Sequence, residues 1–98
     1  MLPAKPDRKS YASVWDAIED DPRVAENLKL RSSLMMKLAA HIRKSGMTQA
    51  QAARALGVSQ PRISDLKRGR IELFAIDGLI NMLASAGLRV EMKVRKAA

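Results

Sequence analysis

Apolar residues recur through the first half of the chain at the spacing of a helix that buries one face. Between residues 22 and 45 they stand three, four or seven positions apart, at Val24, Leu28, Met35, Leu38 and Ile42. Asp21 followed by Pro22 favours a helix start here, while Ser32 and Ser33 offer a second start further along. The pattern therefore predicts either one helix over residues 22–45 or two helices that divide at Ser32.

Two more amphipathic helices are predicted toward the two ends of the chain. Val14 and Ile18 lie four residues apart in a short helix expected over about 10–20. A later helix, which ends near residue 87, is marked by Ile76, Leu79, Ile80 and Leu83. Residues 1–9 carry two prolines, several charges and few apolar side chains, so we expect a flexible N-terminal tail there.

Between these helices, residues 48–70 carry the signals of two short helices joined by a tight turn. Thr48 begins the spacing of a capping box, and Gly57 supplies the left-handed backbone that ends the first helix. Ser59 caps the second helix, and Pro61 stands in its first turn, where a missing N–H costs nothing. Together these signals predict a helix-turn-helix, whose second helix is suited to enter a DNA major groove.

The end of the chain changes to a period of two, which predicts a half-buried β-strand over residues 88–95. Its apolar face is formed by Leu88, Val90, Met92 and Val94. A single strand leaves its backbone groups unpaired, so the simplest partner is the same strand of a second copy, antiparallel across a two-fold axis. An axis at Met92 or at Val90 places opposite charges across from each other, whereas an axis at Glu91 opposes like charges. Addition to another protein's sheet is the alternative.

Charge is distributed unevenly over a chain whose 98 residues suit one domain. Lysine and arginine number 18 against 10 acids, which gives a net charge of +8. Residues 1–26 hold six acids and four bases, a net −2, while residues 27–98 hold four acids and fourteen bases, a net +10. A basic body favours a polyanionic partner, although charge that only maintains solubility is the alternative.

Several classes of function lack the residues that they require. The chain has no cysteine, and its one histidine, His41, has no neighbouring carboxylate or second ligand, so we expect neither a metal site nor a cofactor. No nucleophile–base pair, paired carboxylate site or phosphate-binding glycine loop is present, so we expect no enzyme. The first ten residues lack the apolar core of a signal peptide, and no apolar run is long enough to cross a membrane. We therefore expect a cytoplasmic protein without a membrane partner.

The predicted helix-turn-helix resembles the Cro/repressor-type (XRE) family of transcriptional regulators. The matching residues are Thr48, Gln49, Ala53, Leu56, Gly57, Val58, Ser59, Gln60, Ile63, Ser64, Leu66, Arg68 and Gly69. The resemblance implies an all-α, five-helix domain like that of lambda repressor, here with a C-terminal β-strand that pairs with a second subunit. The expected divisions are the tail over 1–9, a helical extension over 10–31, the DNA-binding domain over 32–87, and the dimerisation strand and tail over 88–98.

This resemblance also implies a partner and a mode of binding. The partner is double-stranded DNA, and a homodimer is expected to bind a palindromic operator. Two recognition helices would then lie about 34 Å apart, one turn of the duplex. Gln49 resembles the family glutamine that bonds phosphate at a helix N-terminus. Gln60 is expected to pair with adenine, Pro61 to contact a thymine methyl, and Arg62 to pair with guanine or hold phosphate. The expected DNA-binding residues are Gln49, Ser59, Gln60, Pro61, Arg62, Ser64, Asp65, Lys67, Arg68 and Arg70.

Two parts of that set have alternatives. Asp65 departs from the basic character of the surface, because DNA repels carboxylates; we expect it to accept from cytosine or to orient Arg62 or Arg68. Lys67, Arg68 and Arg70 are placed for contacts with the DNA backbone, and a solvated basic face is the alternative reading of these three residues.

The layout outside the motif is similar to that of HigA-type antitoxins, through residues 26–32, 74–77 and 87–91. Those relatives repress their own operon and bind a RelE-like ribonuclease toxin. The resemblance implies an autoregulating antitoxin, with the acidic segment 10–26 as the candidate contact for a basic toxin. Trp15 in that segment is expected to pack on the domain or on a partner subunit. A stand-alone repressor without a toxin, and a protein-interaction adaptor that binds no DNA, are the alternatives.

Overall fold

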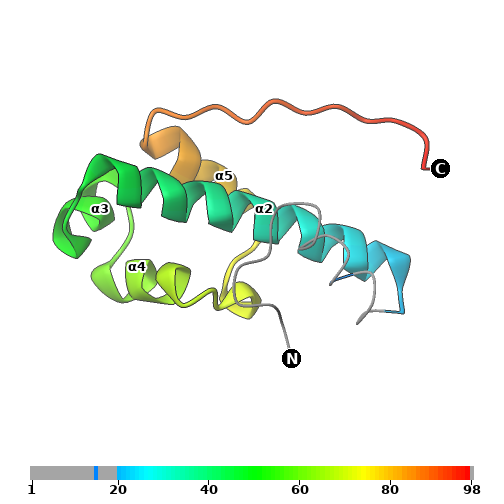
Figure 1. Ribbon diagram of the computed structural model, residues 1–98, viewed down its shortest axis with the longest axis horizontal. Coiled ribbons are helices and arrows are strands. Elements are labelled where there is room, and N and C mark those ends of the chain that lie inside the picture. Colours follow the sequence, from blue (N-terminus) through cyan, green and yellow to red (C-terminus); the bar gives the residue numbers. More distant parts are fainter. Residues whose placement is uncertain (1–14, 16–19, 98) are drawn as a thin grey trace.

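The computed structural model describes Trp15 and residues 20–97, and these residues form four α-helices and one short 3₁₀ helix (Figure 1). The elements are α2 (Pro22–Ser45), α3 (Gln49–Leu56), α4 (Gln60–Lys67), η1 (Ile71–Leu73) and α5 (Ile76–Ser85). α2 runs along the length of the molecule, and the shorter helices pack beside its C-terminal half. The fold is therefore helical, as the sequence predicts, but the described residues form four α-helices and not the five that were expected. The helix expected over residues 10–20 lies outside the described residues apart from Trp15 and Asp20.

α2 is one continuous helix, which decides between the two alternatives for residues 22–45. Asp21 caps its start by accepting the Arg23 backbone N–H at 2.9 Å, and the hydrogen bonds from Arg23 lower the pKa of this carboxyl. Ser32 does not start a second helix, because it lies buried within α2. Its hydroxyl accepts the indole N–H of Trp15 at 2.6 Å, so Trp15 packs on the domain itself.

The predicted caps of the helix-turn-helix are confirmed. Thr48 accepts the Gln51 backbone N–H at 3.1 Å, while the Gln51 side chain accepts the Thr48 backbone N–H at 2.9 Å. Gly57 ends α3 with a φ of +71°, in the left-handed region that glycine tolerates best. Ser59 caps α4 by accepting the Arg62 backbone N–H at 3.3 Å. These local bonds fix the turn that joins the two helices.

The Thr48 cap leads to a stability prediction. Thr48→Ala removes an acceptor for an N–H that has no partner within the helix, and should lower the free energy of unfolding by about 1 kcal/mol. Urea denaturation without DNA measures the difference. Ser45→Ala is the control, because Ser45 is exposed at the end of α2 and caps no helix start. Equal losses in both variants would contradict a specific capping role.

The hydrophobic core lies where the C-terminal half of α2 meets α3, α4 and α5. Its buried residues are Met35, Leu38, Ile42, Ala52, Ala53, Leu56, Ile63, Leu66, Phe74, Leu79, Met82 and Leu83. The N-terminal half of α2 contributes little to this core, because Ala25 is the buried residue among positions 22–31. This half of the helix projects beyond the domain and leaves Val24 and Leu30 exposed.

Arg31 joins the projecting part of α2 to the loop that follows α4. Its guanidinium donates from one nitrogen, Nη1, to the carbonyl oxygens of Ile71 and Phe74, both at 3.2 Å. Its Nε is buried and has no hydrogen-bond partner among the residues that the structure describes. The two bonds satisfy carbonyls in and just after η1, and so help to hold Phe74 in the core.

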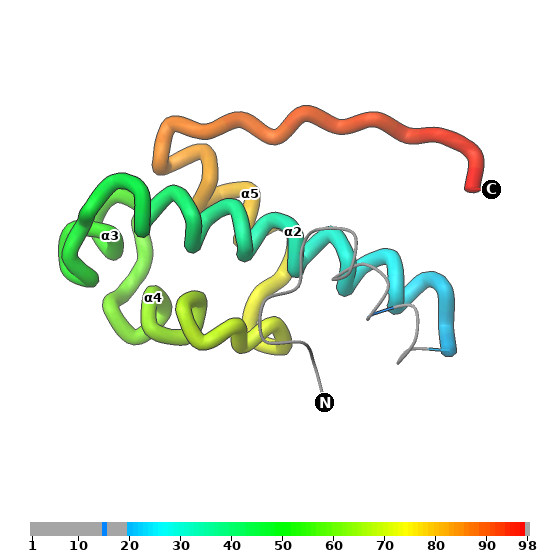
Figure 2. The backbone as a smooth tube through the Cα atoms, in the orientation of Figure 1, coloured from blue at the N-terminus to red at the C-terminus, as the bar shows by residue number. Residues whose placement is uncertain are grey.

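The terminal segment differs from the prediction. Residues 88–97 run extended (Figure 2), but no strand is present among the described residues. The predicted strand is therefore not formed in a single chain, because a strand requires a neighbour for its backbone hydrogen bonds and no other described segment is extended beside it. Leu88 and Val90 are 37% and 40% exposed, whereas Met92 and Val94 are 85% and 88% exposed. The apolar face thus loses its cover on the domain as it moves away from α5.

Candidate nucleic-acid interface

α4 presents one face to the core and the opposite face to solvent. Ile63 and Leu66 are buried. On a helix of 3.6 residues per turn, the positions opposite them are 61, 64, 65 and 68. Pro61 and Arg68 are exposed there, and Ser64 and Asp65 are half-buried. The outward face of α4 is thus formed by four residues that the sequence assigned to DNA.

Arg62 lies on the flank of α4 that faces the following loop. Its guanidinium carbon is 4.2 Å from the centre of the Phe74 ring, within the range of a cation–π interaction. Phe74 itself is buried beneath it. Arg62 was predicted to reach guanine or phosphate, but in this structure it stacks on the ring instead of extending from the outward face. Spacing along the sequence could not reveal this contact, because the two residues belong to separate elements.

Gln49 connects the starts of the two motif helices. Its side-chain amide donates to the backbone carbonyl of Gln60 at 3.2 Å. The acceptor is the backbone of Gln60, so the side-chain amide of Gln60 takes no part in this bond. Gln60 is exposed in the first turn of α4. Gln49 and Gln60, both of which the sequence predicts to contact DNA, are therefore adjacent. Ser59, the N-cap of α4, is exposed beside them.

The loop after α4 holds a second pair of charges. Arg70 donates from Nε to a Glu72 carboxylate oxygen at 2.9 Å. This hydrogen bond lowers the pKa of Glu72 and raises that of Arg70. Asp65 makes no ion pair with Arg62 or Arg68 in the described structure, so the predicted orienting role is not seen. Its charge makes a minor contribution to the raised pKa of Arg70. Arg70 must share its charge between Glu72 and any phosphate.

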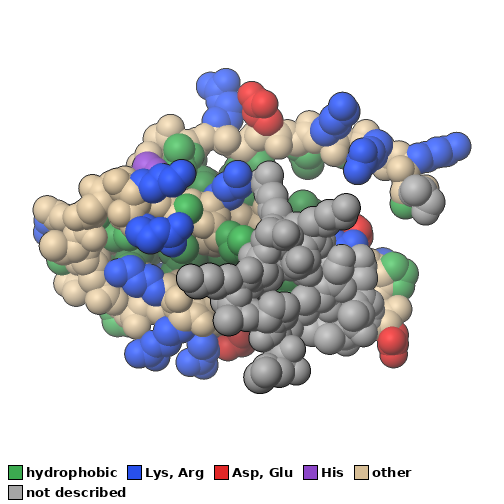
Figure 3. Space-filling view, in the orientation of Figure 1, with side chains coloured by type: hydrophobic (Ala, Val, Ile, Leu, Met, Phe, Trp, Pro, Cys, Tyr) green, Lys and Arg blue, Asp and Glu red, His purple; other side chains and the backbone are tan. Residues whose placement is uncertain are grey.

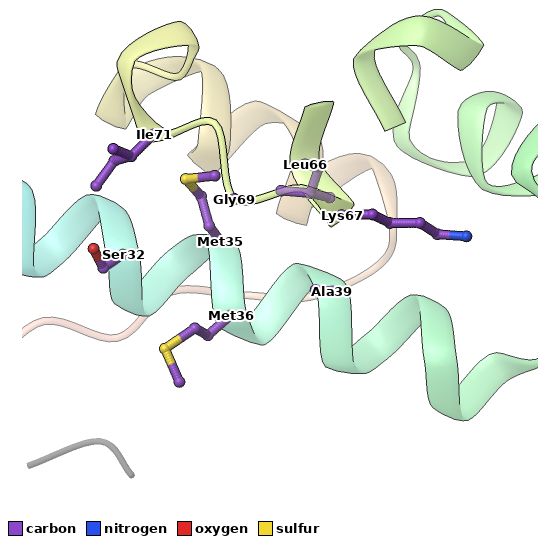
Figure 4. Close-up of a pocket in the computed structure, with 8 residues that line it drawn as sticks. All are labelled: Ser32, Met35, Met36, Ala39, Leu66, Lys67, Gly69 and Ile71. Atoms are coloured by element: carbon purple, nitrogen blue, oxygen red, sulfur yellow. The ribbon is translucent and has the colours of Figure 1, made fainter. Parts of the chain in front are cut away.

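Lys67 lies on the other flank of α4, toward α2. It borders an apolar pocket of about 150 Å³ lined by Met35, Met36, Leu66 and neighbouring residues. Its side chain leaves that pocket and extends along α2 toward the C-terminal end of the helix (Figure 4). There it lines a second, larger groove of about 420 Å³. Lys67 therefore lies at the margin of the outward face, between two hollows.

Basic side chains gather around these elements. Figure 3 shows lysines and arginines over the C-terminal half of α2 and over α4. The exposed ones are Lys37, Arg43, Lys44, Arg54, Lys67, Arg68 and Arg70. The sequence has no acid from residue 27 to residue 64, so nothing along α3 or the start of α4 neutralises them. Such a field attracts a polyanion.

Other kinds of site are not found in the part of the chain that the structure describes. No three histidine, cysteine or acidic side chains come together there as metal ligands would. None of its helices combines the length and apolar character that crossing a membrane requires.

Comparisons with known proteins place this geometry among its relatives. Residues 17–95 match a family described as "Helix-turn-helix domain", a match that runs from before α2 through most of the terminal segment. A solved structure named "Putative XRE Family Transcriptional Regulator" is similar, with a TM-score of 0.69 and 33% sequence identity over 74% of this chain and 82% of that chain. A search of curated proteins found no match.

Proposed function

The chain belongs to the XRE-type helix-turn-helix family, and from this we propose that it is a sequence-specific DNA-binding transcriptional regulator that represses its target. The observation that carries the proposal is α4. This helix is capped at its start, buried on one face through Ile63 and Leu66, and exposed on the other face amid basic side chains. A helix presented in this way fits the width of a major groove.

Base recognition falls to the outward face of α4 and its first turn. Gln60 pairs with adenine through its exposed amide, and Pro61 contacts a thymine methyl. Asp65 accepts a hydrogen bond from the amino group of cytosine, which is the base contact that suits a carboxylate. Gln49 and Ser59 at the helix starts, with Lys67, Arg68 and Arg70 at the margins, contact phosphates. The Arg62 guanidinium stacks on the Phe74 ring and so helps to hold α4 against the core. To contact the duplex, its side chain would have to move off that ring.

The regulator acts as a homodimer on a palindromic operator. Support for this comes from the terminal segment, whose extended backbone pairs with no strand of the described chain and whose apolar residues Met92 and Val94 are almost fully exposed. Antiparallel pairing with a second copy would satisfy the backbone and cover this face. The two-fold axis that results would give two recognition helices to two half-sites.

Gln60→Ala tests the assignment of the recognition helix. The operator is first obtained by binding selection on random duplexes. The variant should then lose about 1–3 kcal/mol of binding free energy on that operator and discriminate less well at one base pair. The bond from Gln49 is kept, because it uses the Gln60 backbone. Fluorescence anisotropy at fixed salt measures both effects.

Asn81→Ala is the matched control, since Asn81 is exposed on α5 and remote from α4 in the chain. It should bind as the unaltered protein does. Unchanged affinity and selectivity of Gln60→Ala would contradict the base-reading role of α4. If the unaltered protein selects no sequence and shows no salt-dependent affinity for DNA, the adaptor alternative is favoured instead.

The regulator is also the autoregulating antitoxin of a toxin–antitoxin pair. The supporting observation is the N-terminal half of α2, which projects from the domain and exposes Val24 and Leu30 beside Glu26. An exposed apolar patch of this kind suits a protein partner such as a RelE-like ribonuclease, although Glu26 is already paired with Lys29 at 3.0 Å. Co-expression with the product of the adjacent reading frame tests this. The two proteins should co-purify, and cells whose growth the partner alone inhibits should grow again when this chain is present. Repression without any such partner would favour the stand-alone repressor.

A further inference from the structure

The larger of the two grooves lies where the helix-turn-helix meets the C-terminal end of α2. It runs between the C-terminal end of α2 and the end of α4, and its lining includes Ala39, Ile42, Gly46 and Met47. Two charged residues from different helices line it, Arg43 from the last turn of α2 and Lys67 from the last turn of α4. None of the residues that line it is acidic. The groove therefore combines a mostly apolar lining with two cations.

This groove adjoins the proposed DNA-binding surface. Gly46 and Met47 line it, and the next two residues are Thr48, the cap of α3, and Gln49. Lys67, in the last turn of α4, also lines it. A duplex backbone that passes the start of α3 would therefore continue toward Arg43 and Lys67.

We infer that Arg43 and Lys67 together hold a phosphate of the duplex that flanks the base pairs read by α4. The inference rests on the proposed DNA-binding function and extends the contact surface to α2. The ligand class is a phosphodiester, because two cations with no acid in the lining bind a single negative charge and offer no acceptor for a base. Arg43 supplies a planar fork of N–H donors, and Lys67 supplies a mobile point charge.

The chain offers a closely matched pair of variants for the test. Arg43 and Lys44 are adjacent, exposed, positively charged and in the last turn of α2, so either alanine variant loses the same charge at the same helix end. Arg43 lines the groove, whereas Lys44 does not. Arg43→Ala should flatten the plot of log affinity against log salt by about 0.9 for each subunit bound, the slope for one phosphate, and so by about 1.8 for the proposed dimer on its full operator. Lys44→Ala should leave the slope near that of the unaltered protein.

A second measurement uses two duplexes, one that ends at the selected operator and one that extends several base pairs beyond it. The unaltered protein and Lys44→Ala should bind the longer duplex more tightly. Arg43→Ala should lose that gain. Lys67→Ala should lose it as well, which provides a second test if Arg43→Ala does not fold as judged by circular dichroism. Arg43→Lys should recover part of the gain by restoring the charge.

The outcomes separate the two proposals. If the unaltered protein selects no DNA sequence, the proposed function fails and this inference falls with it. If it does select an operator, but Arg43→Ala and Lys67→Ala keep the full slope and the full gain from flanking DNA, the groove holds no phosphate. Equal losses in Arg43→Ala and Lys44→Ala would also overturn the inference, because they would show a general effect of charge.

Discussion

A chain that ends at Gly87 should bind the full operator about 10²–10⁴-fold more weakly than the intact chain. Removing residues 88–98 deletes the extended segment but none of the four helices. In the proposed dimer, binding of the first half-site makes binding of the second intramolecular, and that advantage disappears with the segment. Titration of both proteins against the full operator measures the loss.

Two comparisons isolate the cause of that loss. A duplex with one half-site should bind both proteins about equally, because only one recognition helix is engaged. A chain that ends at Arg95 keeps Leu88, Val90, Met92 and Val94 and should bind the operator like the intact chain. Sedimentation equilibrium should show a dimer for the intact chain and a monomer for the shorter one. Equal operator affinity in the two chains would contradict pairing through this segment.

Phe74→Ala should lower the free energy of unfolding by about 3–5 kcal/mol, the usual cost of removing a buried aromatic ring. Phe74 is only 2% exposed and belongs to the core between α2, α4 and α5. The substitution leaves a cavity and also removes the surface on which Arg62 rests. Urea denaturation should show the loss, and the remaining folded protein should bind its operator less well.

Two neighbouring substitutions separate these contributions. Leu73→Ala changes an exposed apolar residue in the same loop, and should have a small effect because Leu73 is 40% exposed. Arg62→Ala removes the cation but keeps the ring, and should cost about 0.5–1 kcal/mol. A Phe74→Ala variant no less stable than Leu73→Ala would show that the ring does not support the core.

Local signals predicted the helix-turn-helix because each acts within a few residues. The caps at Thr48 and Ser59 and the turn at Gly57 depend on their own backbone and on side chains three positions away. The same reasoning left α2 undecided at Ser32. In the structure that serine is buried within the helix and bonds Trp15, 17 positions earlier, a contact that local spacing does not reveal.

The site was less predictable where it depends on contacts between elements. Local capping signals and family resemblance identified α4, but the division of its residues into outward and flanking positions required the packed helix. Arg62 was assigned to DNA because arginine suits guanine, and only the fold shows Phe74 beneath it. Arg43 was not assigned at all, although a stretch of 38 residues without an acid, 27–64, was a signal that α2 shares the basic surface.

The core of this protein has a consequence for how the proposed dimer would assemble. The buried residues of that core come from the helices of a single chain and from Phe74 in the loop before α5, and they pack without any strand pairing among the described residues. Helical domains of this kind have low contact order and complete their folding within microseconds to milliseconds. Each copy would thus reach its native structure alone, and association would follow as a separate second-order event. Its rate would rise with the amount of protein made, so operator occupancy would depend on the square of the monomer concentration.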